Sequence, residues 1–217
     1  MNPENLPASL GRIRRACRAW PTPAVTQISR SGSPFRVLVS TLISLRTRDE
    51  VTEAASERLF ALADDPEGML RVPPAKIRDA IYPAAFFRNK QRSLLALCRI
   101  LLHDYAGRVP DTLDELLALP GVGRKTANLT LILGFDKPGI CVDTHVHRIC
   151  NRWGLVRTRT ADETEMALRE TLPKRYWKEL NNLLVAFGQN CCKPQSPVCS
   201  ECPVEEFCVK LGVTRKR

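Results

Sequence analysis

No segment of this 217-residue chain is long and apolar enough to cross a bilayer, which takes about 20 consecutive apolar residues. The first twenty residues also lack the uninterrupted apolar stretch of a secretory signal peptide. We therefore expect a cytoplasmic protein that has no membrane partner.

The sequence also lacks the signals of β-structure. It has no series of alternating apolar and polar residues joined by hairpin turns, no coiled-coil heptads and no low-complexity tract. Apolar residues recur instead at spacings of three and four, which is typical of a buried helix face. Four segments carry this pattern clearly: residues 34–45, 51–62, 90–102 and 165–172. We predict an all-α protein with about ten helices.

Acidic residues are in the minority, since 23 Asp and Glu stand against 33 Lys and Arg, which gives a net charge of +10. Such an excess favours a polyanionic partner, and nucleic acid is the commonest one. A basic surface that is merely solvated would have the same composition. The charge alone therefore leaves nucleic-acid binding open.

The nine cysteines are an odd number, and in a reducing cytoplasm they argue against a disulfide framework. Four of them have the spacing C-x6-C-x2-C-x5-C near the end of the chain: Cys192, Cys199, Cys202 and Cys208. Four thiolates within seventeen residues can surround one metal centre. The spacing alone permits either tetrahedral zinc or a [4Fe–4S] cluster. Cys191 is excluded as a ligand because it would lengthen the first spacing to seven.

The remaining cysteines lie in helical or apolar stretches, where a thiol usually packs as a small apolar group. They are Cys17, Cys98, Cys141 and Cys150. We expect packed thiols at these four positions, with no role in metal binding.

A glycine-containing turn is predicted between two helices. Thr112 and Glu115 form a capping-box signature at the start of the first helix, and the second follows the string L-P-G-V-G-R-K over residues 119–125. Gly121 and Gly123 allow a tight reversal and let the backbone approach another surface closely. Amides at the start of the second helix could then bind an anion. A tight turn between core helices would use the same two glycines.

Lys125 falls in the first turn of that second helix, where the helix dipole and Arg124 disfavour another positive charge. A neutral lysine amine is a nucleophile, whereas an exposed lysine that contacts phosphate is the ordinary alternative. Asp143, eighteen residues further on, precedes the helical pattern of residues 144–154 and is expected to cap that helix. A nearby carboxylate would favour the charged form of the Lys125 amine, which opposes the effect of the helix dipole. The residues alone therefore leave the protonation state of Lys125 open.

Three features together resemble the endonuclease III family of DNA glycosylases. They are the string L-P-G-V-G-R-K-T-A over residues 119–127, the string V-D-T-H over residues 142–145, and the spacing of the four cysteines. The resemblance implies that the turn is a helix–hairpin–helix motif, in which Gly121, Val122 and Gly123 bind DNA. It also implies a [4Fe–4S] cluster, which is expected to be structural.

The resemblance further implies roles for single residues. Lys125 would attack C1′ of a damaged nucleotide and release the base, and a Schiff base and β-elimination of the 3′ phosphate would follow. Asp143 would accept the lysine proton or stabilise the cationic sugar. His145 is expected near the site. Lys193 is the single cation in a loop, between the first two cluster ligands, where the family carries several basic residues.

Two segments that resemble the family's base-flipping loops differ at the critical residue. In S-L-R-T-R-D, which runs from Ser44 to Asp49, Arg46 replaces the glutamine that enters the duplex. In A-F-F-R-N-K, Phe86 replaces the family's leucine wedge. An arginine can still donate to the orphaned base, and a phenyl ring can stack between bases. A surface arginine and a core phenylalanine are the ordinary alternatives. Ser44 and Asp49 match pocket-lining positions.

The resemblance implies a two-lobed all-α fold with a DNA cleft between the lobes. A six-helix barrel with the hairpin is expected at residues 27–137, and a helical iron–sulfur cluster lobe at residues 1–26 and 138–217. The implied enzyme removes oxidised pyrimidines of the thymine-glycol type and cleaves the abasic site. We expect a nucleoid-associated monomer that binds damaged double-stranded DNA. The alternatives are a related glycosylase that acts on mismatched or alkylated bases, and a DNA-binding helix–hairpin–helix protein without catalytic activity.

Overall fold

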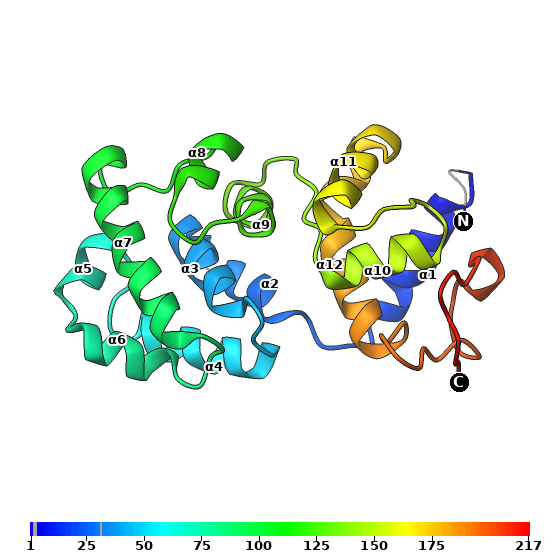
Figure 1. Ribbon diagram of the computed structural model, residues 1–217, viewed down its shortest axis with the longest axis horizontal. Coiled ribbons are helices and arrows are strands. Elements are labelled where there is room, and N and C mark those ends of the chain that lie inside the picture. Colours follow the sequence, from blue (N-terminus) through cyan, green and yellow to red (C-terminus); the bar gives the residue numbers. More distant parts are fainter. Residues whose placement is uncertain (2–3, 31) are drawn as a thin grey trace. The chain divides into compact units, whose positions relative to one another are not determined.

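The computed structural model describes residues 1, 4–30 and 32–217. Over this part the chain forms twelve α-helices and two 3-10 helices, without strands, which confirms the all-α prediction (Figure 1). The α-helices span Leu6–Cys17 (α1), Ala24–Ser29 (α2), Pro34–Ser44 (α3), Asp49–Phe60 (α4), Pro66–Arg71 (α5), Pro74–Ile81 (α6), Phe87–Tyr105 (α7), Leu113–Ala118 (α8), Arg124–Phe135 (α9), Thr144–Arg152 (α10), Ala161–Thr171 (α11) and Trp177–Asn190 (α12). The 3-10 helices span Lys174–Tyr176 (η1) and Glu205–Phe207 (η2).

The helices exceed the expected ten because some are very short. For example, α2 and α5 have six residues each, which is too few to show a helical period in the sequence. Among the described helices, none combines the length and the apolar character needed to span a membrane.

The chain divides into two compact units. One unit comprises Ala24–Gly139, and the other combines Met1–Pro23 with Ile140–Arg217. The boundaries expected from the sequence, at residues 27 and 137, fall within three residues of this division.

The central element of the unit Ala24–Gly139 is α3, which packs against α2, α4, α7 and α9 (Figure 1). Its sequence is apolar almost all round, so it can be buried on every face. The hydroxyls of Ser40 and Thr41 are buried with it and donate to the carbonyls of Arg36 and Val37 one turn earlier. The Ser33 side chain caps the helix by accepting from the Arg36 amide. This well-packed helix forms a rigid centre for the unit.

The core of the other unit is built around α12, which packs against α1 and α10. Leu180, Leu184 and Phe187 of α12 are fully buried, and the Phe187 ring lies 6.1 Å from that of Trp153. The short helix α10 buries Val146 in the same core. This packing fixes the start of α10, whose N-cap residue is Asp143.

Candidate nucleic-acid interface and metal centre

The hairpin between α8 and α9 is the tight reversal that the sequence predicts. The Thr112 side chain caps α8 by accepting from the Glu115 amide, and it also bonds to the Glu115 carboxylate, so both members of the predicted capping box are engaged. Gly121 has a φ of +79°, in the left-handed region, and a Cβ there would lie 3.2 Å from the Ser93 Cβ. The fold itself therefore requires glycine at position 121.

Gly123 is different, because the fold does not require it. Its φ of −101° is open to any residue, and a Cβ added there would meet nothing within 4 Å. Val122, between the two glycines, is buried. The bare backbone at Gly123 thus faces open space, and a partner can approach it closely.

Lys125 lies in the first turn of α9, half-buried, next to Arg124. The N-cap residue of this helix, Gly123, has no side chain to cap it, and the first turn contains no acidic residue. The helix start therefore carries the positive end of the dipole together with two basic side chains. This arrangement is suited to binding a phosphate.

Asp143 is the N-cap of α10, as the sequence predicts. Its Oδ1 accepts from the amides of His145 and Val146, both at 2.9 Å. The two bonds fix the orientation of the carboxylate, which is half-buried. His147, on the same helix, contacts the Thr164 hydroxyl at 2.7 Å and so ties α10 to α11.

His145 is held tightly on α10. Its Nδ1 lies 3.2 Å from Nη2 of Arg148, which also donates to the carbonyl of Cys192 at 2.8 Å. A Cβ at Gly188 of α12 would lie 2.4 Å from this Nδ1, so only glycine fits opposite the imidazole. Burial lowers the pKa of the Arg148 guanidinium. The sequence did not reveal Arg148 or Gly188 as neighbours of His145.

Arg46 and Phe86 lie together in the structure. The guanidinium carbon of Arg46 is 5.7 Å from the centroid of the Phe86 ring, and both residues have a φ of +55°. The Phe86 side chain is exposed, with 60% of the residue surface accessible, so the alternative of a core phenylalanine is wrong. An exposed aromatic ring beside a guanidinium is a combination that can stack on a base.

A half-buried lysine, Lys90, joins the two loops that carry these residues. Lys90 Nζ donates to the carbonyls of Ile43 and Leu45, each at 2.7 Å, and to the Thr47 hydroxyl at 2.9 Å. The Ala85 amide donates to the same hydroxyl at 3.1 Å. Burial lowers the pKa of Lys90 to about 8. Sequence reasoning missed Lys90, although it ends the A-F-F-R-N-K string.

The two residues expected in the substrate pocket are both half-buried. Ser44 ends α3, and its hydroxyl donates to the Thr41 carbonyl at 2.8 Å. Asp49 begins α4 and accepts from the Ala24 amide through Oδ2 at 3.4 Å. Both contacts hold local structure, and a pocket role for Ser44 and Asp49 stays a prediction.

The four predicted cluster ligands line one cavity of about 340 Å³, which includes space open to solvent. The exposed surface of its lining is almost entirely apolar. Four thiols around one largely apolar cavity are the donor set that an iron–sulfur cluster requires, so these residues fit the group. Cys191, which the spacing excludes, lines the same cavity. In the described part of the chain, no three His, Cys, Asp or Glu are arranged to hold a single metal ion.

Arg152 holds the loop that contains the first ligand. This arginine is 8% exposed, and its Nη1 donates to the Lys193 carbonyl at 2.7 Å and to Cys192 Sγ at 3.4 Å. Its Nη2 donates to the Pro194 carbonyl. The guanidinium therefore bonds to the first ligand and to the two residues that follow it. Arg152 is a further residue that the sequence analysis did not find.

The cysteines outside the metal centre behave as predicted. Cys98, Cys141 and Cys150 are fully buried, and Cys17 is partly exposed and contacts the Leu183 carbonyl through its sulfur. Burial raises the pKa of the Cys98 and Cys150 thiols to about 12, so both remain protonated. They are packed thiols with no sign of reactivity.

Comparison with known proteins gives matches over most of the chain. The family model of HhH-GPD superfamily base excision DNA repair proteins matches residues 39–174. The model of the iron–sulfur binding domain of endonuclease III matches residues 192–208, from the first predicted ligand to the last. Endonuclease III of Thermotoga maritima is 51% identical over 175 residues, which are 81% of this chain and 82% of that one.

Two solved structures are similar over nearly the whole chain. A trapped endonuclease III–DNA covalent intermediate has a TM-score of 0.85 and 31% identity, and the match covers 97% of each chain. A non-covalent endonuclease III–DNA complex has a TM-score of 0.86 and 32% identity, and the match covers 97% of this chain and 96% of that one.

Proposed function

Because this chain belongs to the endonuclease III family of base-excision repair enzymes, we propose that Lys125 and Asp143 are its catalytic pair. Family membership makes the protein a DNA glycosylase and AP lyase that carries a [4Fe–4S] cluster. A relative with 31% identity forms a covalent intermediate with DNA, and such an intermediate needs a nucleophile. The observation that carries the proposal is Lys125, which lies in the first turn of α9, directly after the hairpin between α8 and α9.

In the proposed reaction, the uncharged amine of Lys125 attacks C1′ of the damaged nucleotide. The glycosidic bond breaks and its electron pair leaves with the base. The nitrogen lone pair then expels the ring oxygen O4′ from C1′, which opens the sugar and gives a protonated Schiff base, and the electron demand of this Schiff base acidifies the C2′ proton. Loss of that proton expels the 3′ phosphate by β-elimination. Asp143 accepts the proton from the attacking amine or stabilises the cationic sugar.

We propose that the hairpin residues Gly121, Val122 and Gly123 bind a phosphate of double-stranded DNA. The uncapped start of α9 and the open space beside Gly123 support this role. His145 and Lys193 are proposed as further DNA contacts. We also propose a nucleoid-associated location and a monomeric state.

Arg46 and Phe86 are proposed to fill the gap that a flipped nucleotide leaves in the duplex. Their exposure and mutual contact support this, because both side chains are available at one place on the unit. Ser44 and Asp49 are proposed to line the pocket for the flipped base. We propose oxidised pyrimidines of the thymine-glycol type as the substrate.

The metal centre has a supporting role in this proposal. Cys192, Cys199, Cys202 and Cys208 would hold the [4Fe–4S] cluster. When bound, the cluster would supply iron–thiolate bonds that cross-link residues 192–208 and stabilise the conformation of this segment. Arg152 then orients the loop at Cys192 through its bonds to three neighbouring groups.

Borohydride trapping tests the nucleophile. The wild type and Lys125→Ala are incubated with a thymine-glycol duplex in the presence of borohydride, and Lys76→Ala serves as an exposed-lysine control. The wild type and the control should yield a covalent protein–DNA adduct, and Lys125→Ala should yield none. If the wild type binds the duplex and gives no adduct, or if Lys125→Ala gives a normal yield, the assignment is wrong.

A further inference from the structure

The last residues of the chain pair with the loop at the metal centre. The Arg217 amide donates to the Pro197 carbonyl at 2.9 Å, and the Ser200 amide donates to the Arg217 carbonyl at 3.0 Å. Both bonds use backbone atoms, so they do not depend on the Arg217 side chain. They place the end of segment 209–217 beside the loop between the first two cysteines of the cluster.

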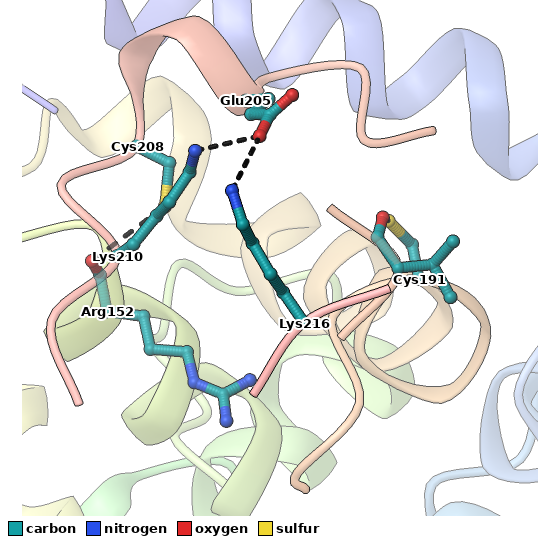
Figure 2. A network of polar contacts seen from close by, with 7 residues as sticks. Arg152, Cys191, Glu205, Cys208, Lys210 and Lys216 are labelled. Atoms are coloured by element: carbon teal, nitrogen blue, oxygen red, sulfur yellow. Dashed lines mark hydrogen bonds and ion pairs between the residues drawn. The ribbon is translucent and has the colours of Figure 1, made fainter. Parts of the chain in front are cut away.

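The same segment has a second set of anchors. Glu205 forms ion pairs with Lys210 at 2.7 Å and with Lys216 at 3.9 Å (Figure 2). The Leu211 amide donates to the Arg152 carbonyl at 3.0 Å. Segment 209–217 is therefore bonded near both of its ends, and Val213 lines the metal cavity between them. The segment follows a defined path over this unit.

Three consecutive cations lie at the end of this anchored segment. Arg215, Lys216 and Arg217 are all exposed, whereas the neighbouring loop 193–198 contains Lys193 as its single charged residue. Lys216 keeps most of its charge available, because an exposed ion pair at 3.9 Å is weak. Anchoring by the backbone leaves the three cationic side chains exposed, without the ordering cost that a loose tail would have.

We propose that Arg215, Lys216 and Arg217 form a binding site for DNA phosphates on the surface of the iron–sulfur unit. The site adds three positive charges to the single one, Lys193, of loop 193–198. The proposal rests on the proposed function, since it adds contacts to the same DNA. It concerns the DNA backbone alone, so the site binds damaged and undamaged duplexes alike.

The salt dependence of DNA binding tests the site. The variant R215Q/K216Q/R217Q removes three charges and keeps the backbone bonds of Arg217. A control, R71Q/K76Q/R78Q, lowers the net charge equally on exposed residues of α5 and α6. Affinity for an undamaged duplex is measured by fluorescence anisotropy over a salt series, with iron content and visible absorbance checked for each protein.

Each phosphate contact contributes about 0.9 to the slope of log K against log salt. The slope should therefore fall by about 2 to 3 in R215Q/K216Q/R217Q and stay unchanged in the control. The charge-conserving variant R215K/R217K should keep the wild-type slope. An unchanged slope in R215Q/K216Q/R217Q would overturn the site, and so would an equal fall in the control, which would indicate a general effect of net charge.

Borohydride trapping by the wild type, run in parallel, separates the two proposals. Failure of the wild type to form the adduct would refute the role of Lys125 and leave the slopes unaffected. If the wild type forms the adduct and R215Q/K216Q/R217Q has the same salt slope as the wild type, the phosphate site is refuted and the role of Lys125 stands.

Discussion

The guanidinium of Arg46 lies over the ring of Phe86, with 5.7 Å between the guanidinium carbon and the ring centroid. Each of the two residues has a left-handed backbone, which is uncommon outside glycine and costs about 1 kcal/mol or more. Such a conformation persists only where the surroundings impose it. Here Lys90 and Thr47 tie the two loops together. Arg46 and Phe86 are therefore presented at the surface as one preformed unit.

Phe86→Ala should impair cleavage of lesion-containing duplexes by about 10- to 100-fold, because stacking on a base contributes about 1–3 kcal/mol. Binding to single strands should change far less, since a single strand leaves no gap to fill. The measurements are single-turnover cleavage of a thymine-glycol duplex and anisotropy on the matching single strand. Equal losses in both assays would argue against a wedge.

The contact between Arg46 and Phe86 should appear as non-additivity. We expect Arg46→Ala and Phe86→Ala to lose less together than the sum of their separate losses, by about 0.5–1 kcal/mol, which is typical of an exposed cation–π pair. A double-mutant cycle on duplex affinity measures the coupling. Strict additivity would mean that the two side chains act independently.

Lys90 should make stability depend on pH. Its pKa falls from 10.5 to about 8 because burial disfavours the charged amine. Between these values the unfolded chain retains a proton that the folded chain has lost, so this group makes the unfolding free energy rise with pH. The advantage of the wild type over Lys90→Met should therefore grow from about pH 8 to pH 10.5.

Urea denaturation at a series of pH values measures this difference. Lys76→Met, at an exposed lysine, is the matched control and should track the wild type throughout. At neutral pH, Lys90→Met should still be less stable, because it leaves the Ile43 and Leu45 carbonyls without their donor, at about 1–3 kcal/mol. A difference between the wild type and Lys90→Met that is constant with pH would contradict the linkage.

Asp143 caps α10 and is also proposed to be catalytic. The substitutions Asp143→Asn and Asp143→Ala separate these two roles. Asn caps a helix about as well as Asp, so Asp143→Asn should be nearly as stable as the wild type, whereas Asp143→Ala should lose about 1 kcal/mol. Both variants should lose lyase activity by about 100-fold or more, because neither can accept a proton. Thermal unfolding and single-turnover trapping measure the two effects. Normal activity in Asp143→Asn would leave the cap as the residue's sole role.

The two adjacent cysteines should differ in their effect on the cluster. Cys192→Ser should lose iron, because it removes a thiolate ligand, and Cys191→Ser should keep it. Iron analysis and visible absorbance of the purified variants measure this. Loss of iron in Cys191→Ser, with retention in Cys192→Ser, would reverse the assignment made from the spacing. Cys191 lines the same cavity, so the comparison is a sharp one.

The sequence was most informative where structure is decided locally. The capping box at Thr112, the cap at Asp143 and the turn at Gly121 each depend on residues a few positions apart, and each prediction is confirmed. The helical fold followed from periodicity for a similar reason, since each long helix shows its buried face in its own sequence.

Other features of the site could not be predicted, because they depend on residues far apart in the chain. Lys90 bonds to carbonyls more than forty positions earlier, and Arg152 to carbonyls about forty positions later. A lysine or arginine has the same local pattern whether it is buried or solvated. The left-handed backbone of Arg46 and Phe86 is likewise imposed by tertiary contacts, so neither sequence string revealed it.

The two hairpin glycines are constrained in different ways. Position 121 is constrained by folding, because its backbone is left-handed and Ser93 lies against it. Position 123 is under no such constraint within the chain, so a side chain there would alter affinity for a partner without altering the folded state. Substitution of residue 123 should therefore change the affinity for a partner, whereas substitution of residue 121 should lower the stability of the fold.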